Sequence, residues 1–340
     1  MGDFWGFQEA WLSYTGSIFD MAIYPTLFVA YLARLAPWFG AGYRPLMVAF
    51  GVVIVCLVLN LAGVHSVGVS CFWLLLLLSA PFACIVLFSP FKIGARAGAH
   101  TAPVNSTFGL IGGMLVARWN FMGWDNASTI AREVHEPQRT YPRALLGAVV
   151  VISLSYILPV LGVWITGIPA SAFETGSWAD LGGLIAGDWL RAAIVFCGML
   201  SGFGMFNALL MSYARVPLAM AQDGMLPKFF TRMNGRTRAP WAAIVFSAAV
   251  FSLGLGLGLD RLVTLDVLLA GTSVVLEFIA LVALRIREPG LPRPFRVPGG
   301  LTGAILSGVF PAVLLVLAAI HSHDEEILGM NALLFGALMI

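Results

Sequence analysis

Long apolar segments alternate with short polar segments along almost the whole chain. A helix that crosses a membrane needs ~20 mostly apolar residues. By this criterion the sequence predicts about ten spans, and the last of them is short. They lie at 7–35, 44–64, 67–91, 107–130, 142–166, 189–214, 240–259, 262–284, 300–321 and 327–340. We therefore predict an all-α fold, a multi-pass transmembrane helical bundle.

The amino-acid composition indicates that lipid, rather than water, surrounds most of the protein surface. Hydrophobic residues make up 59% of the 340 residues and charged residues only 11%, whereas soluble domains carry about 25% charged residues. The formal net charge of +2 is too small to indicate a nucleic-acid partner. The four cysteines lie inside apolar runs and predict neither a disulfide framework nor a metal site: Cys56, Cys71, Cys84 and Cys197.

The distribution of basic residues predicts the orientation. Lys and Arg concentrate in the cytoplasmic connections of membrane proteins. One alternating set of connections holds most of them: Arg132, Arg139, Arg143, Lys228, Arg232, Arg236, Arg238, Arg285, Arg287, Arg293 and Arg296. The other set is richer in acids. We therefore predict that the basic connections and the N-terminus are cytoplasmic and that 92–106 lies outside.

The segment 107–133 turns polar in the middle of a predicted span. Polar, aromatic and glycine residues follow closely there: Arg118, Trp119, Asn120, Gly123, Trp124, Asp125 and Asn126. At 1.5 Å per residue, Arg118 lies ~16 Å from the start of the span, near mid-membrane. A charge at that depth is costly and faces a cavity or a partner. We predict a broken helix that lines a substrate site; the alternative is a continuous helix in which Arg118 pairs with Asp125.

Three further acids lie within predicted spans, namely Glu9, Asp20 and Glu277. Intramembrane acids are candidate functional residues, and burial brings their pKa towards neutrality. They are therefore possible proton or ammonium sites. For Glu9, which lies near a predicted membrane surface, the alternative is simple solvation at that surface.

Residues 119–144 resemble the sixth helix and following loop of the amino acid–polyamine–organocation (APC) superfamily. The pattern is W-N-x-x-x-W-D-x-x-S-T followed by E-V-x-x-P-x-x-x-x-P-x-A. Its members here are Trp119, Asn120, Trp124, Asp125, Ser128, Thr129, Glu133, Val134, Pro137, Pro142 and Ala144. Segments 212–227 and 293–300 also resemble the family, and 4–9 with Asp20 and Tyr24 resembles its third helix. The polyamine-uptake branch of plants and protists is the most similar.

The resemblance implies the leucine-transporter-type inverted-repeat fold, in which helices one and six are broken around the substrate. In this register residues 1–340 form a single transmembrane permease domain, from helix three to part of helix twelve. We therefore expect the chain to be N-terminally truncated, without the first two helices. The residues implied to contact the substrate or to gate it are Asn120, Phe121, Gly123, Trp124 and Asp125.

The implied function is transport of polyamines or amino acids by a secondary, proton-coupled, alternating-access permease, in the plasma membrane. Its partners would be the small-molecule substrate, H⁺ and the lipid bilayer. We expect no cofactor, no metal and no catalytic residue, because enzyme motifs such as H-E-x-x-H and G-x-S-x-G are missing. The alternative is a truncated, non-transporting sensor or regulatory subunit. Arg118 departs from the polyamine branch, which usually has an apolar residue there, and would disfavour a polyamine unless Asp125 neutralises it.

Overall fold

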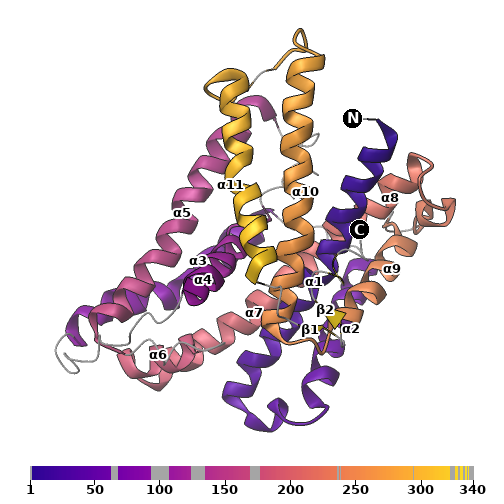
Figure 1. Cartoon of the computed structure of the whole chain (residues 1–340). Helices are drawn as coiled ribbons and strands as arrows, with labels where there is room; N and C mark the ends of the chain where they lie inside the picture. The colour runs from indigo at the N-terminus through magenta and orange to yellow at the C-terminus, as the bar shows by residue number, and fades with distance from the viewer. Residues whose placement is uncertain are drawn as a thin grey trace.

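The computed structural model describes residues 2–62, 68–92, 107–123, 135–168, 177–235, 237, 239–293, 295–321, 326–327, 330–331, 334 and 336. The described chain is a bundle of α-helices with one minimal pair of strands (Figure 1). The α-helices are α1 (Asp3–Leu35), α2 (Arg44–Ala62), α3 (Gly68–Phe88), α4 (Thr107–Asn120), α5 (Pro137–Ile165), α6 (Trp178–Ala186), α7 (Asp188–Tyr213), α8 (Arg215–Gln222), α9 (Trp241–Phe251), α10 (Leu259–Arg287) and α11 (Gly300–His321).

Short elements connect these helices. The 3-10 turns are η1 (Pro37–Gly40), η2 (Ser89–Lys92), η5 (Lys228–Thr231) and η6 (Ser252–Gly254), and the strands β1 (Glu326–Ile327) and β2 (Met330–Asn331) pair antiparallel. The N-terminus, the start of α5 and the α10–α11 connection lie toward one end of the molecule in Figure 1, whereas α6 and the α1–α2 connection lie toward the other.

Seven of the described helices are long and apolar enough to cross a membrane. They are α1, α2, α3, α5, α7 continued by α8, α10 and α11. Six of them match a predicted span to within five residues at each end, whereas α7 with α8 continues to Gln222, eight residues beyond the predicted end at 214. The prediction of an all-α, multi-pass membrane protein is thereby confirmed.

Two predicted spans differ in the structure. The predicted span 240–259 is α9, which has only 11 residues, because glycines follow it closely and Gly256 adopts a left-handed φ of 94°. In the predicted span 327–340, the described residues at 330–331 form strand β2. Apolar composition alone does not reveal where glycine interrupts a helix.

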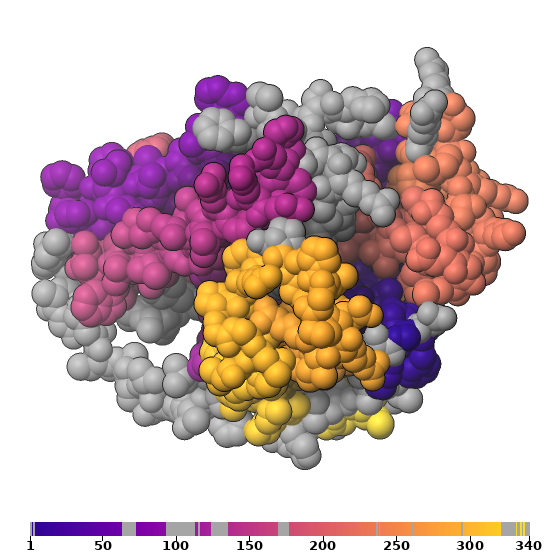
Figure 2. All heavy atoms as spheres, turned by 90° about the horizontal axis from the view of Figure 1, so that it is seen from above, coloured from indigo at the N-terminus to yellow at the C-terminus, as the bar shows by residue number. Residues whose placement is uncertain are grey.

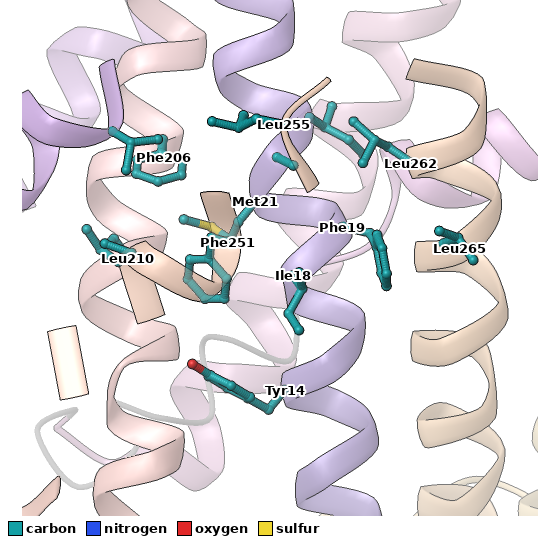
Figure 3. Close-up of a cluster of buried hydrophobic side chains, with 14 of the residues drawn as sticks. Tyr14, Ile18, Phe19, Met21, Phe206, Leu210, Phe251, Leu255, Leu262 and Leu265 are labelled. Atoms are coloured by element: carbon teal, nitrogen blue, oxygen red, sulfur yellow. The ribbon is translucent and has the colours of Figure 1, made fainter. Parts of the chain in front are cut away.

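The helix α1 is the central element of the bundle. It makes its most extensive contacts with α10 and α7. Apolar side chains of these helices and of α9 form the main core, shown in Figure 3. The labelled members include Tyr14, Ile18, Phe19 and Met21 of α1, Phe206 and Leu210 of α7, Phe251 of α9, and Leu262 and Leu265 of α10.

Small residues allow α1 to approach its neighbours closely. A Cβ atom added to Gly202 of α7 would lie 2.8 Å from the Tyr24 carbonyl oxygen of α1. A Cβ added to Gly16 of α1 would lie 3.1 Å from the backbone nitrogen of Ala270 in α10. Lipid is as apolar as leucine, so close packing at small residues is a main source of helix association in membranes.

A second, smaller core joins α3 and α5 to α6 and the start of α7. It is more peripheral, and α5 buries few of its side chains. Figure 2 shows α10 and α11 between α5 on one side and the α8–α9 region on the other.

Candidate functional site

The helix α4 ends inside the predicted span. Its last turn closes with hydrogen bonds of 3.0 Å from the backbone nitrogens of Phe121 and Met122 to the carbonyls of Arg118 and Trp119. Gly123 then adopts a left-handed φ of 89°. A helix of 14 residues is about 21 Å long, shorter than the ~30 Å hydrocarbon core. Trp124 and Asp125, two of the predicted site residues, lie outside the described residues.

The last three residues of α4 contact three different helices. Arg118 donates from Nη1 to the carbonyl of Val267 in α10, at 3.0 Å. Trp119 donates from its indole nitrogen to Asp20 in α1, at 3.3 Å. The carbonyl of Asn120 accepts a hydrogen bond of 3.2 Å from the hydroxyl of Tyr156 in α5. The end of α4 is therefore held from three sides just before the chain departs from helical geometry.

The Asp20 carboxylate is the centre of a hydrogen-bonded cluster. Oδ1 accepts hydrogen bonds from the Tyr24 hydroxyl at 3.1 Å and from the Trp119 indole at 3.3 Å. Oδ2 accepts one from the Tyr213 hydroxyl of α7 at 3.3 Å. Tyr24 stands one helical turn after Asp20, so both side chains lie on the same face of α1. The cluster thus joins α1, α4 and α7 at one carboxylate.

These donors make a charge at Asp20 tolerable. A partly buried carboxylate such as Asp20 needs hydrogen bonds or a cation to offset the loss of water, and each hydrogen bond to a charged group is worth about 1.5–3 kcal/mol. These three donors are neutral side chains, so they add no positive charge of their own beside the carboxylate. The arrangement can therefore attract a cationic group or accept a proton.

Arg118 lies against α10 near another acid, Asp266, which is buried. Its guanidinium interacts electrostatically with Asp266, which is only 2% exposed. Gly271 provides the space, because a Cβ atom there would lie 3.0 Å from Nη2 of Arg118. Asp266 also interacts electrostatically with Tyr24. Because Arg118 and Trp119 are consecutive residues, the contact of α4 with α10 lies next to its contact with Asp20.

Asp266 is a residue that the sequence analysis missed. It lies inside the predicted span 262–284, four residues from its start, so the rule that singled out Asp20 and Glu277 applies to it too. Trp119 and Tyr213 appear in the family motifs, but nothing in their spacing indicates that they would meet at Asp20.

Glu9 and Glu277 lie further along the two helices that carry Asp20 and Asp266. Each is eleven residues from the acid of its own helix, which is three turns and about 16 Å, and thus on the same helical face. Glu9 is half-buried and accepts a hydrogen bond of 3.0 Å at Oε1 from the Ser273 hydroxyl of α10. Glu277 is half-buried one turn after Ser273. The structure therefore places both acids away from the end of α4.

Phe121 and Gly123 border the end of α4. The Phe121 ring is 39% exposed and contacts Tyr156 edge-on, with ring centroids 5.7 Å apart. Among the described residues no group of three or more His, Cys, Asp or Glu side chains could hold a metal ion. The polar groups that are brought together suit an organic cation or a proton.

The combination of seven long apolar helices with a charged cluster at the end of a shorter helix is typical of secondary transporters. The sequence model of the amino acid permease family matches residues 1–339. This chain therefore belongs to the amino acid permease family.

Its relatives in that family include plant and bacterial transporters. The chain is 34% identical over 345 aligned residues to the polyamine transporter RMV1 of Arabidopsis thaliana, covering 100% of this chain and 69% of the relative. It is 31% identical to the polyamine transporter PUT1 of Oryza sativa subsp. japonica, covering 100% and 64%. The serine/threonine exchanger SteT of Bacillus subtilis is 26% identical, over 87% of this chain and 69% of that protein. The chain thus spans about two thirds of each relative.

Proposed function

We propose that this chain transports polyamines or amino acids across the plasma membrane by alternating access, coupled to protons. Residues 1–340 act as one permease domain on the inverted-repeat scaffold, with α1 and α4 in the positions of its third and sixth helices. The names of the relatives support both substrate classes. Polyamines and amino acids share an ammonium group, so one anionic site can serve either.

The observation that carries this proposal is the Asp20 carboxylate with its three donors from α1, α4 and α7. An ammonium group can replace the neutral donors or add to them at this carboxylate. The indole of Trp119 and the phenols of Tyr24 and Tyr213 surround the carboxylate with aromatic rings. Such rings also attract organic cations.

The other predicted site residues take supporting roles in this proposal. Asn120, Phe121 and Gly123 form the end of α4, where a change in backbone conformation can open or close the site. Trp124 and Asp125 follow directly in the sequence and are assigned to substrate contact or gating. Glu9 and Glu277 are assigned to proton or ammonium transfer along the α1–α10 contact, where Ser273 already joins the two helices at Glu9.

The sidedness follows from the distribution of charge. The basic residues of the α10–α11 connection and of the start of α5 lie toward the same end of the molecule as the N-terminus (Figure 1). We assign this end to the cytoplasm because basic connections face the cytoplasm in most membrane proteins.

The test is uptake of radiolabelled spermidine and of radiolabelled amino acids by transport-deficient cells that express the 340-residue chain. Asp20→Asn should reduce uptake at least about tenfold, because it removes the charge while keeping the shape. Asp180→Asn is the matched control. Asp180 of α6 forms ion pairs with Arg34 near the end of α1 and with Arg191 near the start of α7. Asp180→Asn should therefore change uptake by less than about twofold.

Two results would contradict the proposal. Equal uptake by Asp20→Asn and the unaltered chain would remove Asp20 from the site. Binding of substrate to the purified protein without any uptake in cells or proteoliposomes would instead indicate a non-transporting receptor.

A further inference from the structure

An apolar groove runs between α10 and α11. It consists of two adjoining parts with volumes of about 460 and 310 Å³. Its lining comes from these two helices alone, from residues between Val275 and Ile286 on α10 and between Ala304 and Leu317 on α11. Gly308 brings the helices close together beneath the groove, because a Cβ atom there would lie 3.0 Å from the Cβ of Phe278. The groove therefore offers an apolar surface without polar side chains.

The groove has the length of a lipid acyl chain in one leaflet of a membrane. Eleven positions separate Val275 from Ile286, which is about 16 Å along α10, and half of the ~30 Å hydrocarbon core is about 15 Å. Ile286 is 63% exposed and Val309 is 48% exposed. Only 17% of the most apolar window of α11 is buried within the described chain. The groove therefore opens to the surroundings of the bundle, where lipid lies.

Basic residues gather at the end of the groove where α10 connects to α11. Residues 285–300 contain four arginines and one acid, Glu288. Two of the arginines stabilise the connection itself. Arg285 donates to the carbonyl of Gly300, and Arg293 donates to carbonyls at the end of α10. These two guanidinium groups are therefore already used within the protein.

The other two arginines, Arg287 and Arg296, are exposed at this end of the groove. Arg287 directly follows Ile286, which lines the groove on α10. Arg296 precedes Val297, whose Cγ1 atom lies 3.8 Å from the position of a Cβ atom on Gly303, near the start of α11. Within the described part of the chain neither arginine forms an ion pair or a side-chain hydrogen bond. Both guanidinium groups are therefore available to a ligand.

We propose that this groove binds an anionic phospholipid, with an acyl chain between α10 and α11 and the phosphate at Arg287 and Arg296. An apolar groove that ends at two guanidinium groups is complementary to a molecule with an apolar chain and an anionic head. Guanidinium groups bind phosphate oxygens through charge-assisted, often bidentate, hydrogen bonds. The end that carries them is assigned to the cytoplasm, and the cytoplasmic leaflet is the anionic one. The inference is independent of the transported substrate.

The experiment compares two lipids with the same acyl chains, dioleoylphosphatidylglycerol, which is anionic, and dioleoylphosphatidylcholine, which is zwitterionic. Native mass spectrometry of the purified 340-residue chain in detergent gives the dissociation constant of each lipid. The unaltered chain should bind the anionic lipid about 25-fold more tightly, because each basic residue near an anionic headgroup contributes a factor of about five.

Removing the two arginines tests the headgroup site. Arg287→Gln and Arg296→Gln should each reduce the preference for the anionic lipid about fivefold, and the double variant should bind both lipids equally to within about twofold. Lys228→Gln is the matched control, because Lys228 is an exposed basic residue of another connection and does not line the groove. It should change the preference by less than about twofold.

Filling the groove tests the acyl-chain site separately. Ala312 lines both parts of the groove, so Ala312→Leu places a larger side chain where the acyl chain would lie. Both lipids should bind about tenfold more weakly, which is the contribution of roughly two buried methylene groups, and the preference for the anionic lipid should stay unchanged. Ala148→Leu on the exposed face of α5 is the control and should leave both dissociation constants unchanged.

Three results would overturn the inference. Equal binding of the two lipids by the unaltered chain would make the groove a surface for bulk lipid. A preference that survives in the double arginine variant would place the headgroup elsewhere. A dimer that retains no lipid and that Ala312→Leu dissociates would assign the groove to a second copy of the chain. Should Ala312→Leu fail to fold, the variants of the two exposed arginines decide the matter.

Discussion

The helices α5 and α10 make an instructive pair. Both have 29 residues, and their most apolar eighteen-residue windows have the same mean hydropathy. Yet 28% of that window is buried in α10 and only 6% in α5. The helix α10 packs against α1, α4 and α11, whereas α5 has its main contacts with α3. Two helices of equal hydropathy therefore differ in position: α10 contributes to the candidate site, whereas α5 mostly faces outward.

The difference lies in a few small and polar residues. The helix α10 presents Ala270 and Gly271 to Gly16 and Arg118, and its Ser273 reaches Glu9. The buried residues of α5 are Pro159, Gly162 and Val163. Close backbone contact and polar pairing, rather than apolar content, decide which helices associate in lipid.

The largest effect is expected from filling the contact between α7 and α1. Gly202→Val places side-chain atoms where the Tyr24 carbonyl lies, 2.8 Å from an ideal Cβ. We expect a loss of about 3 kcal/mol or more in stability, measured as thermal stability of the solubilised protein by fluorescence-detected size exclusion. Gly147→Val on α5 is the control, because nothing lies within 4 Å of its Cβ position. Equal stability of the two variants would contradict the assigned packing.

The next effect should come from removing a donor to Asp20. Tyr213→Phe deletes a hydrogen bond to a carboxylate, worth about 1.5–3 kcal/mol, whereas Tyr156→Phe on α5 deletes one to a neutral carbonyl, worth about 0.5–1.5 kcal/mol. The free energy of unfolding, measured on the solubilised protein, should therefore fall by about 1.5–3 kcal/mol in the first variant and clearly less in the second. The same loss in both would show that Asp20 is no special centre.

Ser273→Ala should have an intermediate effect. It removes the hydrogen bond that joins α10 to Glu9. We expect the free energy of unfolding, measured by thermal unfolding, to fall by about 1 kcal/mol, since Glu9 is only half-buried. Ser307→Ala on α11 is the matched control, because that hydroxyl bonds the Gly303 carbonyl of its own helix and is exposed. A control that destabilises as much as Ser273→Ala would remove the α1–α10 contact as the cause.

The smallest effect is expected at the α2–α7 contact. Asn60 donates from Nδ2 to Oδ1 of Asn207, at 2.9 Å, and such interhelical bonds average about 0.6 kcal/mol in membranes. The Oδ1 atom of Asn60 is buried without a hydrogen-bond partner among the described residues, so Asn60→Ala also relieves a cost. The free energy of unfolding of Asn60→Ala should be lower than that of the unaltered chain by less than about 1 kcal/mol. A loss as large as that of Gly202→Val would show that this contact had been underestimated.

Much of the fold was accessible from the sequence. The long spans follow from apolar length, and α4 ends at Asn120, inside the segment whose polar and glycine residues predict a break. Asp20 was identified as an acid at membrane depth. Asp266 could have been found by the same rule.

The contacts between side chains from distant parts of the chain could not be predicted from the sequence. For Arg118 the sequence offered Asp125, seven residues away, which lies outside the described residues. The electrostatic interaction of Arg118 with Asp266, 148 positions further along the chain, was not predicted. Trp119 and Tyr213 meet at Asp20 from α4 and α7, a meeting that depends on how three helices pack. The short α9 differs from its predicted span because the glycines after Phe251 end the helix.

The sequence by itself determined that this is a membrane protein, where seven of its long apolar helices lie and which of its spans carry charge. Those properties depend on each residue and on its transfer from water to lipid. Only the tertiary structure decided that α10 rather than α5 faces α1, and that the end of α4 contacts both Asp20 and α10. Lipid and an apolar helix are nearly equivalent solvents for an apolar side chain, so hydropathy cannot choose between them. Glycine contacts and pairs of polar groups from distant parts of the chain make that choice.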